Sequence, residues 1–120
     1  ADVVWKKVGD FCGIASWHPA IAKCELSHGK KIRTLSLKGG GTIEERLLKW
    51  NNKGMNYTYT IVSSPLPVTH YISTIKVVPD GSGSDAIWTG KYKAKKGTSD
   101  ADAKKAIDGI YKAGMDSLAQ

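Results

Sequence analysis

The spacing of hydrophobic residues changes twice along the chain, from helical to alternating and back to helical. Near the start, Val4, Val8 and Phe11 fall on one face of a predicted helix over residues 2–11. A glycine two positions later ends this helix. A second, shorter helical turn then precedes Pro19, whose ring excludes a longer helix.

Between residues 21 and 94 the polar and apolar residues alternate with a period of two, which is typical of half-buried strands. Short stretches rich in Gly, Pro and Asn separate the strands. Because consecutive strands joined by short turns pair with their neighbours, we expect an antiparallel meander. The predicted strands cover residues 21–27, 31–37, 42–50, 55–63, 68–78 and 84–94.

Residues 98–119 return to helical spacing and form the longest predicted element. The buried side of this helix is small, since Gly109 and Gly114 lie among alanines. Two interpretations are open: the helix packs closely on the sheet, or a cavity holds it away from the sheet. Its apolar stripe consists of Ala103, Ile107, Ile110, Tyr111, Gly114 and Leu118.

Charged residues mark the start and the outer face of this last helix. Ser99, with an acidic residue three positions later, resembles a capping box. Asp100 and Lys104, and likewise Asp108 and Lys112, have the spacing of ion pairs in which the acid comes first.

One carboxylate falls on a strand face that should be apolar. Glu45 lies in phase with Ile43 and Leu47, and a buried carboxylate is costly unless it is paired or reaches water. This pattern predicts a wet pocket in which Glu45 is a polar anchor. The alternative is a strand turned over, with Leu48 and Trp50 inward and Glu45 in solvent.

Further polar groups share the inward faces. Ser73 lies between Tyr71 and Ile75, and three more aromatic residues, Tyr57, Tyr59 and Trp88, join the same faces. His18 is a candidate proton-transfer group or anion contact at a cavity mouth, or alternatively a turn cap.

Several function classes lack the residues they need. No serine has a nucleophile-elbow context, and the glycines at 39–41 lead into a strand rather than a helix, unlike a phosphate loop. No Cys/His set has zinc spacing, and we expect neither a metal nor a cofactor. The formal net charge of +7 is spread over the elements, so nucleic acid is not an expected partner. The default is a solvated basic surface, and the charge is also compatible with an acidic protein partner or an anionic surface. We expect one domain over residues 1–120 and no transmembrane segment.

The two cysteines, Cys12 and Cys24, flank a tight turn. Their spacing is compatible with a disulfide or with two buried thiols. A disulfide would stabilise the fold by about 3 kcal/mol and would indicate an oxidising compartment.

Taken in order, these segments resemble the START-like, helix-grip (Bet v 1) superfamily, and within it the polyketide cyclase/dehydrase-like group with the MxaD-like proteins. The resemblance rests on residues 4–11 (VWKKVGDF), 17–21 (WHPAI), 45–47 (ERL), 64–68 (SPLPV) with Tyr71, and 109–118 (GIYKAGMDSL). It implies an α+β fold, in which a curved antiparallel sheet is wrapped around the C-terminal helix, with two short N-terminal helices and a cavity between. The first strand of the family is absent here, so we expect six strands.

In the plant hormone receptors of the superfamily the matching positions face a ligand. The resemblance therefore implies that the cavity is lined by His18, Glu45, Tyr59, Tyr71, Ser73, Trp88, Ile110 and Gly114. The receptors' two mouth loops are replaced here by residues 38–41 and 64–67, so hormone recognition is not expected. Only the geometry of two loops at a cavity mouth is carried over.

MxaD-like members are often exported to the bacterial periplasm, which favours the Cys12–Cys24 disulfide and a removed leader; a cytoplasmic protein is the alternative. The resemblance implies a non-enzymatic carrier or sensor of a small apolar or amphipathic ligand. A periplasmic protein that docks an acidic redox partner is the first alternative. A cyclase/dehydrase-type enzyme, with Glu45 or His18 moving protons, is the second. No oligomeric state is predicted.

Overall fold

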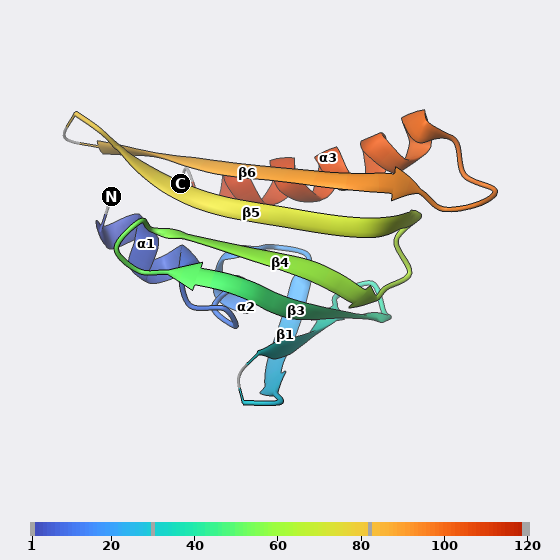
Figure 1. Cartoon of the computed structure of the whole chain (residues 1–120), viewed down its shortest axis with the longest axis horizontal. Coiled ribbons are helices and arrows are strands. Elements are labelled where there is room, and N and C mark those ends of the chain that lie inside the picture. Colours follow the sequence, from blue (N-terminus) through green and yellow to red (C-terminus); the bar gives the residue numbers. More distant parts are fainter. Residues whose placement is uncertain (1, 30, 82, 119–120) are drawn as a thin grey trace.

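Six strands and three helices make up the computed structural model, which describes residues 2–29, 31–81 and 83–118. The strands form one curved antiparallel sheet, and α3 lies along β6 at one side of it (Figure 1). In chain order the elements are α1 (Asp2–Val8), α2 (Ile14–Trp17), β1 (Ile21–Ser27), β2 (Ile32–Leu37), β3 (Thr42–Asn51), β4 (Asn56–Ser63), β5 (Val68–Asp80), β6 (Gly83–Ala94) and α3 (Asp100–Leu118).

The strands pair in sequence order, β1-β2-β3-β4-β5-β6, which confirms the predicted meander. Irregularities of register occur in β1, β3, β4 and β5, and such bulges increase local twist and bend the strand. The bulge in β5 contains His70, which has a positive φ of 54° and is exposed. The bent sheet has a concave inner face, and the core lies between this face and the helices.

The N-terminal helix is shorter than predicted. It ends at Val8 rather than at Phe11, and the backbone of Gly9 lies against the indole of Trp5. A Cβ at Gly9 would lie 2.6 Å from that ring, so the close approach requires glycine. Phe11 is nevertheless buried as its spacing predicted, because the turn after α1 places its ring in the core.

The C-terminal helix begins at Asp100, two residues later than predicted, and Leu118 is its last described residue; position 119 lies outside the described residues. Ser99 caps it, since its Oγ accepts a hydrogen bond from the backbone N–H of Asp102 (3.1 Å). The predicted stripe faces the core: Ala103, Ile107 and Gly114 are buried and the other three members are partly buried.

The ion pairs on α3 differ from the predicted ones. Lys104 pairs with Asp108 rather than with Asp100, and Lys112 pairs with Asp116 rather than with Asp108. Asp100 instead lies in the first turn, where a negative charge interacts favourably with the free backbone N–H groups of the helix. Each lysine therefore contacts the acid that follows it.

Candidate functional site

A buried ion pair occupies one end of the concave face. Arg33 on β2 lies directly opposite Glu45 on β3, and its Nε and Nη2 atoms both lie 2.8 Å from Glu45 Oε1. Arg33 is completely buried and Glu45 is 5% exposed. The pair is shielded from water and from screening by salt. Removal of either charge would therefore leave the other buried without a counter-ion.

Three further groups hold the Arg33 guanidinium in place. Its Nη1 donates hydrogen bonds to the backbone oxygen of Phe11 (2.6 Å) and to the hydroxyl of Tyr57 (3.3 Å). The Phe11 and Tyr59 rings lie 4.2 and 4.8 Å from its central carbon, within cation–π range. We call Arg33, Glu45, Phe11 and Tyr57 the ion-pair cluster.

Opposing effects act on the pKa values of this pair. Burial lowers the pKa of Arg33, but the Glu45 carboxylate together with Tyr57 and Tyr59 more than compensates and raises the pKa above its ordinary value. Burial raises the pKa of Glu45, and Arg33 opposes that rise. The net shift of the Glu45 pKa is upward, and the charged guanidinium 2.8 Å away is the group that favours its ionised form.

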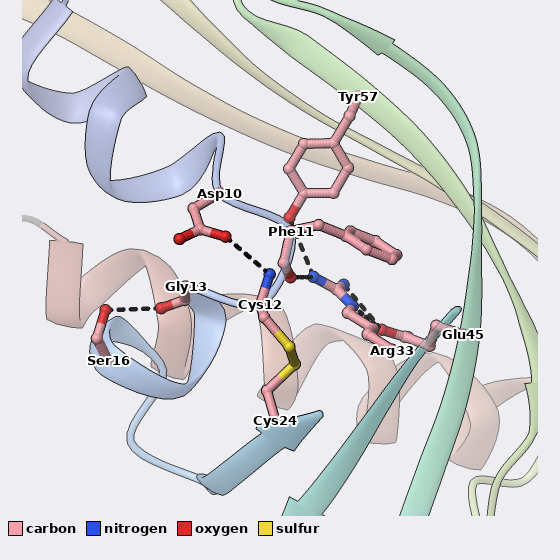
Figure 2. The surroundings of a disulfide bond; sticks show 9 residues. All are labelled: Asp10, Phe11, Cys12, Gly13, Ser16, Cys24, Arg33, Glu45 and Tyr57. Atoms are coloured by element: carbon pink, nitrogen blue, oxygen red, sulfur yellow. Dashed lines mark hydrogen bonds and ion pairs between the residues drawn. A yellow bond between two sulfur atoms is a disulfide. The ribbon is translucent and has the colours of Figure 1, made fainter. Parts of the chain in front are cut away.

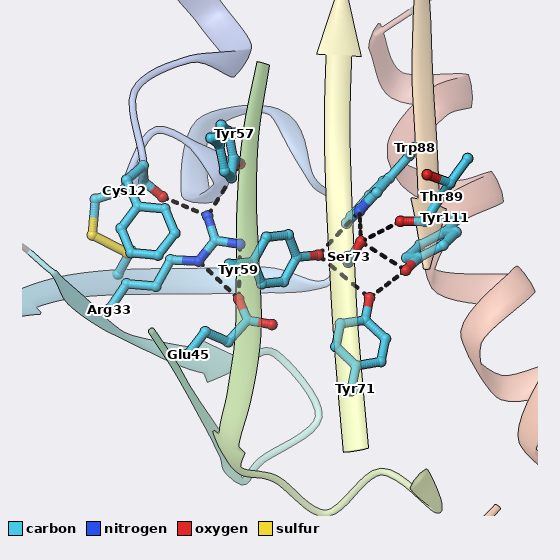
Figure 3. Close-up of polar contacts among 12 residues, drawn as sticks. Cys12, Arg33, Glu45, Tyr57, Tyr59, Tyr71, Ser73, Trp88, Thr89 and Tyr111 are labelled. Atoms are coloured by element: carbon cyan, nitrogen blue, oxygen red, sulfur yellow. Dashed lines mark hydrogen bonds and ion pairs between the residues drawn. A yellow bond between two sulfur atoms is a disulfide. The ribbon is translucent and has the colours of Figure 1, made fainter. Parts of the chain in front are cut away.

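The inward phase of Glu45 is confirmed. Its neighbours in the alternative interpretation, Leu48 and Trp50, are 50% and 48% exposed. Both Arg33 nitrogens that pair with Glu45 contact the same oxygen, Oε1, and Oε2 has no hydrogen-bond partner among the described residues. In Figure 3 this second oxygen points away from Arg33, toward the side of the site on which Tyr71 lies.

A disulfide covers the ion-pair cluster from outside. Cys12 and Cys24 are bonded, with 5.4 Å between their Cα atoms, and link the turn after α1 to β1. Cys12 follows Phe11, whose carbonyl accepts the hydrogen bond from Arg33, so the same short segment carries both links (Figure 2). The bond closes a loop over a sequence separation of 12 residues, and loops of this length stabilise a fold by about 3 kcal/mol.

A second polar cluster lies under α3. It joins four hydroxyl groups and one indole, and its members come from β4, β5, β6 and α3 (Figure 3). We call it the hydroxyl cluster; it consists of Tyr59, Tyr71, Ser73, Trp88 and Tyr111.

The hydrogen bonds of the hydroxyl cluster run in one direction. Ser73 donates its only hydroxyl proton to the backbone oxygen of Thr89 (2.8 Å), so Tyr111, 2.9 Å away, must donate to Ser73. Tyr71 in turn must donate to Tyr111, and Tyr59 to Tyr71 over 3.4 Å. Every hydroxyl proton is therefore already committed to an acceptor.

The indole N–H of Trp88 completes the hydroxyl cluster. It is shared between the Tyr59 hydroxyl (3.0 Å) and Ser73 Oγ (2.9 Å). Burial raises the pKa of Tyr59, Tyr71 and Tyr111, so these phenols remain protonated at neutral pH. The cluster is neutral, and each of its donors is already engaged with an acceptor. Through this cluster Tyr111 links α3 to the sheet.

His18 fastens α2 to α3. Its Nε2 lies 2.8 Å from the backbone oxygen of Ile110 and its Nδ1 accepts a hydrogen bond from the backbone N–H of Ala20 (3.1 Å), which fixes the Nε2–H tautomer. Burial lowers the pKa of His18, and the bond to Ile110 opposes this. Neither ring nitrogen is free to take a proton from a substrate, so an acid–base role in this conformation would fall to Glu45.

Gly114 allows α3 to approach this point closely. A Cβ there would lie 2.8 Å from the His18 ring and 2.9 Å from both Trp17 and Trp88. At this end of the helix the close-packing interpretation therefore holds, and the glycine is required by the contact.

A small cavity lies between the two clusters. Its volume is about 30 Å³, which is room for one or two water molecules. Six of the eight predicted ligand residues line it: His18, Glu45, Tyr59, Tyr71, Trp88 and Ile110. Ser73 and Gly114 do not line it, and their contacts lie behind Trp88 and His18.

Arg33 and Tyr111 were missed in the sequence as members of the site. A signal for Arg33 was present in the sequence. Arg33 shares a strand face with Leu35, and the turn at residues 39–41 places it opposite Glu45. Tyr111 belonged to the predicted stripe, but its hydroxyl contacts depend on side-chain directions across three elements. No group of three or more His, Cys, Asp or Glu side chains in the described ranges could hold a metal ion.

Comparisons with known proteins place this arrangement in a family. The family described as polyketide cyclase/dehydrase and lipid transport matches over residues 1–120. Among solved structures, XoxI from Bacillus cereus is 36% identical, with a TM-score of 0.94 over 98% of this chain and 83% of its own. An uncharacterised protein from Bacillus thuringiensis is also 36% identical (TM-score 0.93; 98% and 86% covered).

A more distant structure has the same fold. The Zhui aromatase/cyclase from a Streptomyces species is 14% identical, with a TM-score of 0.76 over 98% of this chain and 82% of its own. A comparison with curated protein sequences found no match. The six-stranded curved sheet, the C-terminal helix and the short N-terminal helices match the helix-grip structures. The chain therefore belongs to the polyketide cyclase/dehydrase and lipid transport family.

Proposed function

We propose that this protein binds a small apolar or amphipathic molecule between the sheet and α3, as a non-enzymatic carrier or sensor. The observation that carries the proposal is a cavity with aromatic and aliphatic walls and one carboxylate oxygen of the buried Glu45 side chain that has no partner among the described residues. Such walls with few polar groups are typical of ligand sites. The residues assigned to direct contact with the ligand are His18, Glu45, Tyr59, Tyr71, Trp88 and Ile110. Ser73 and Gly114 support this site through their contacts with Trp88 and His18.

The cavity must enlarge to accept a whole ligand. Its volume of about 30 Å³ is far below the roughly 300 Å³ or more of typical ligand pockets. A surface groove of about 320 Å³ lies beside the β4–β5 loop, and Ile61, Leu66 and Tyr71 line both spaces. Leu66 is only partly buried and belongs to a loop, so its movement is the least costly way to join the groove to the cavity.

Native mass spectrometry of the purified protein tests this proposal. An adduct that leaves on denaturation supports binding and identifies the ligand class. The variant Leu66→Trp should close the path and remove the adduct, whereas Ile87→Trp, on the exposed outer face of β6, should keep it. Retention of the adduct in Leu66→Trp would contradict this site.

A second candidate function is docking to an acidic protein. Lys76, Lys91 and Lys93 are exposed on β5 and β6, beside exposed Ile72 and Ile87. None of these lysines takes part in the ion pairs found within the described ranges. Binding to an acidic partner that did not weaken with added salt would count against this face.

We further propose an oxidising compartment such as the bacterial periplasm, which the disulfide supports. None of the described helices is long and apolar enough to cross a lipid bilayer. The test is the denatured mass of protein isolated from its natural host. A gain of two hydrogen atoms on reduction supports export, and no change would indicate free thiols and the cytoplasm.

A further inference from the structure

The polar groups on the cavity wall differ in what they can still offer a ligand. Both ring nitrogens of His18 are engaged with backbone groups. The hydroxyl protons of Tyr59 and Tyr71 pass along the hydroxyl cluster, and the Trp88 N–H is shared between two acceptors inside it. These four side chains therefore present no unused donor to the cavity.

The carboxylate of Glu45 is the opposite case. Arg33 contacts Oε1 through two nitrogens, so Oε2 is left as a free acceptor. Glu45 itself lines the cavity, and in Figure 3 this oxygen points away from Arg33. A carboxylate acceptor shielded from bulk water strongly favours a hydrogen-bond donor, above all a charged one. A ligand carboxylate would meet a like charge there.

The Arg33 guanidinium does not change this preference. It is completely buried between the Phe11 and Tyr59 rings and is not part of the cavity wall. Glu45 and Tyr59, which both contact the guanidinium, do line the cavity. An acidic ligand could reach the positive charge only by displacing Glu45, which would leave a buried carboxylate unpaired.

We infer that the ligand of this cavity is an amphipathic molecule whose buried end is a hydrogen-bond donor, a primary ammonium or a hydroxyl group, received by Glu45 Oε2. The cavity of about 30 Å³ has room for such a group, and the apolar remainder would pass Leu66 into the groove beside the β4–β5 loop. This inference rests on the proposed ligand-binding function and specifies its ligand class.

The experiment compares decylamine, decanol and decanoate, which share one chain and differ in their polar end. Each displaces the neutral fluorescent probe Nile red from the protein at neutral pH. We expect decylamine to bind at least about tenfold more tightly than decanoate, with decanol between them. The net charge of +7 works against this order, since non-specific attraction to the protein would favour decanoate.

The variant Glu45→Gln sharpens the comparison. Arg33 needs an oxygen acceptor, so the amide oxygen takes the position of Oε1 and the NH₂ group takes that of Oε2. The wall then offers a donor, and the preference should reverse toward decanoate. The double variant Arg33→Met/Glu45→Leu leaves no buried charge unpaired, and it should lose the decylamine preference without gaining decanoate.

The outcomes separate this inference from the proposed function. Tight decanoate binding to the wild-type protein, or a decylamine preference that survives in both variants, would overturn the donor assignment while binding itself stands. Failure of all three compounds to displace the probe, or equal displacement in Leu66→Trp, would overturn the ligand-binding function and the inference with it. Reversal in Glu45→Gln supports both.

Discussion

The two polar clusters on the concave face are built on different principles. The ion-pair cluster is charged, is tied to the N-terminal segment by the Arg33–Phe11 hydrogen bond, and lies next to a disulfide. The hydroxyl cluster is neutral and connects the sheet to α3 through Tyr111 alone. The turn after α1 is thus held by the ion-pair cluster and the disulfide, and α3 is held by the hydrogen bonds of the hydroxyl cluster.

This difference assigns them different parts in binding. The hydroxyl cluster is saturated, so it can support the cavity wall but has no donor left for a ligand. The ion-pair cluster leaves one acceptor oxygen at the cavity. The helix side is held by hydrogen bonds of about 1 kcal/mol each, and the path to the free oxygen opens instead at Leu66 in the β4–β5 loop.

The largest expected effect comes from breaking the ion pair on one side. Glu45→Ala leaves the Arg33 guanidinium buried without its anion, and the free energy of unfolding should fall by about 3 to 5 kcal/mol. The double variant Arg33→Met/Glu45→Leu should fall much less, because it leaves no unpaired charge. Urea denaturation measures both. Equal losses in the two would mean that packing, not charge, dominates at this cluster.

Two glycines of the same helix should respond with opposite signs. Gly114→Ala places a methyl group within 2.9 Å of three rings and should destabilise the protein by about 1 to 3 kcal/mol. Gly109→Ala meets no atom within 4 Å and should stabilise it by roughly 0.5 to 1 kcal/mol. Thermal unfolding distinguishes them. A stabilised Gly114→Ala would show that α3 is not seated on Trp17 and Trp88.

The hydroxyl cluster should be less sensitive than the ion pair. Tyr111→Phe removes the acceptor for Tyr71 and the donor to Ser73, which should cost about 1 kcal/mol. The matched control is Tyr92→Phe, since the Tyr92 ring stacks on Tyr71 but makes no hydrogen bond within the described ranges. Its effect should stay within about 0.5 kcal/mol. Equal effects of the two variants would contradict the directed chain.

The sequence predicted the strands well because their alternation and turns are local signals, and it predicted the phase of Glu45 from Ile43 and Leu47. Arg33 was within reach of the same reasoning, since the hairpin register fixes its partner. The hydroxyl cluster could not be predicted in this way, because it depends on how α3 approaches β5 and β6. The size of the cavity could not be predicted either, since it is the small volume that many packed side chains leave unfilled.

The smallest expected effect is a pH dependence set by His18. Its pKa is lowered in the folded state, chiefly by burial, so the unfolded chain takes up the proton first as the pH falls. Its contribution to stability is complete above the unfolded pKa of about 6.5 and is lost as the pH falls through the lower folded value. Protonation also removes the lone pair with which Nδ1 accepts the hydrogen bond from Ala20.

Glu45 acts in the opposite sense, because burial raises its pKa and the folded state then holds the proton more tightly than the unfolded chain. The informative quantity is therefore the difference in the free energy of unfolding between wild type and His18→Gln, measured by urea denaturation from pH 7.5 to 5. That difference should shrink as the pH falls, whereas the exposed His28→Gln should run parallel to wild type. A constant difference would show that His18 holds α2 and α3 together equally well when protonated, and that the hydrogen bond from Ala20 is dispensable.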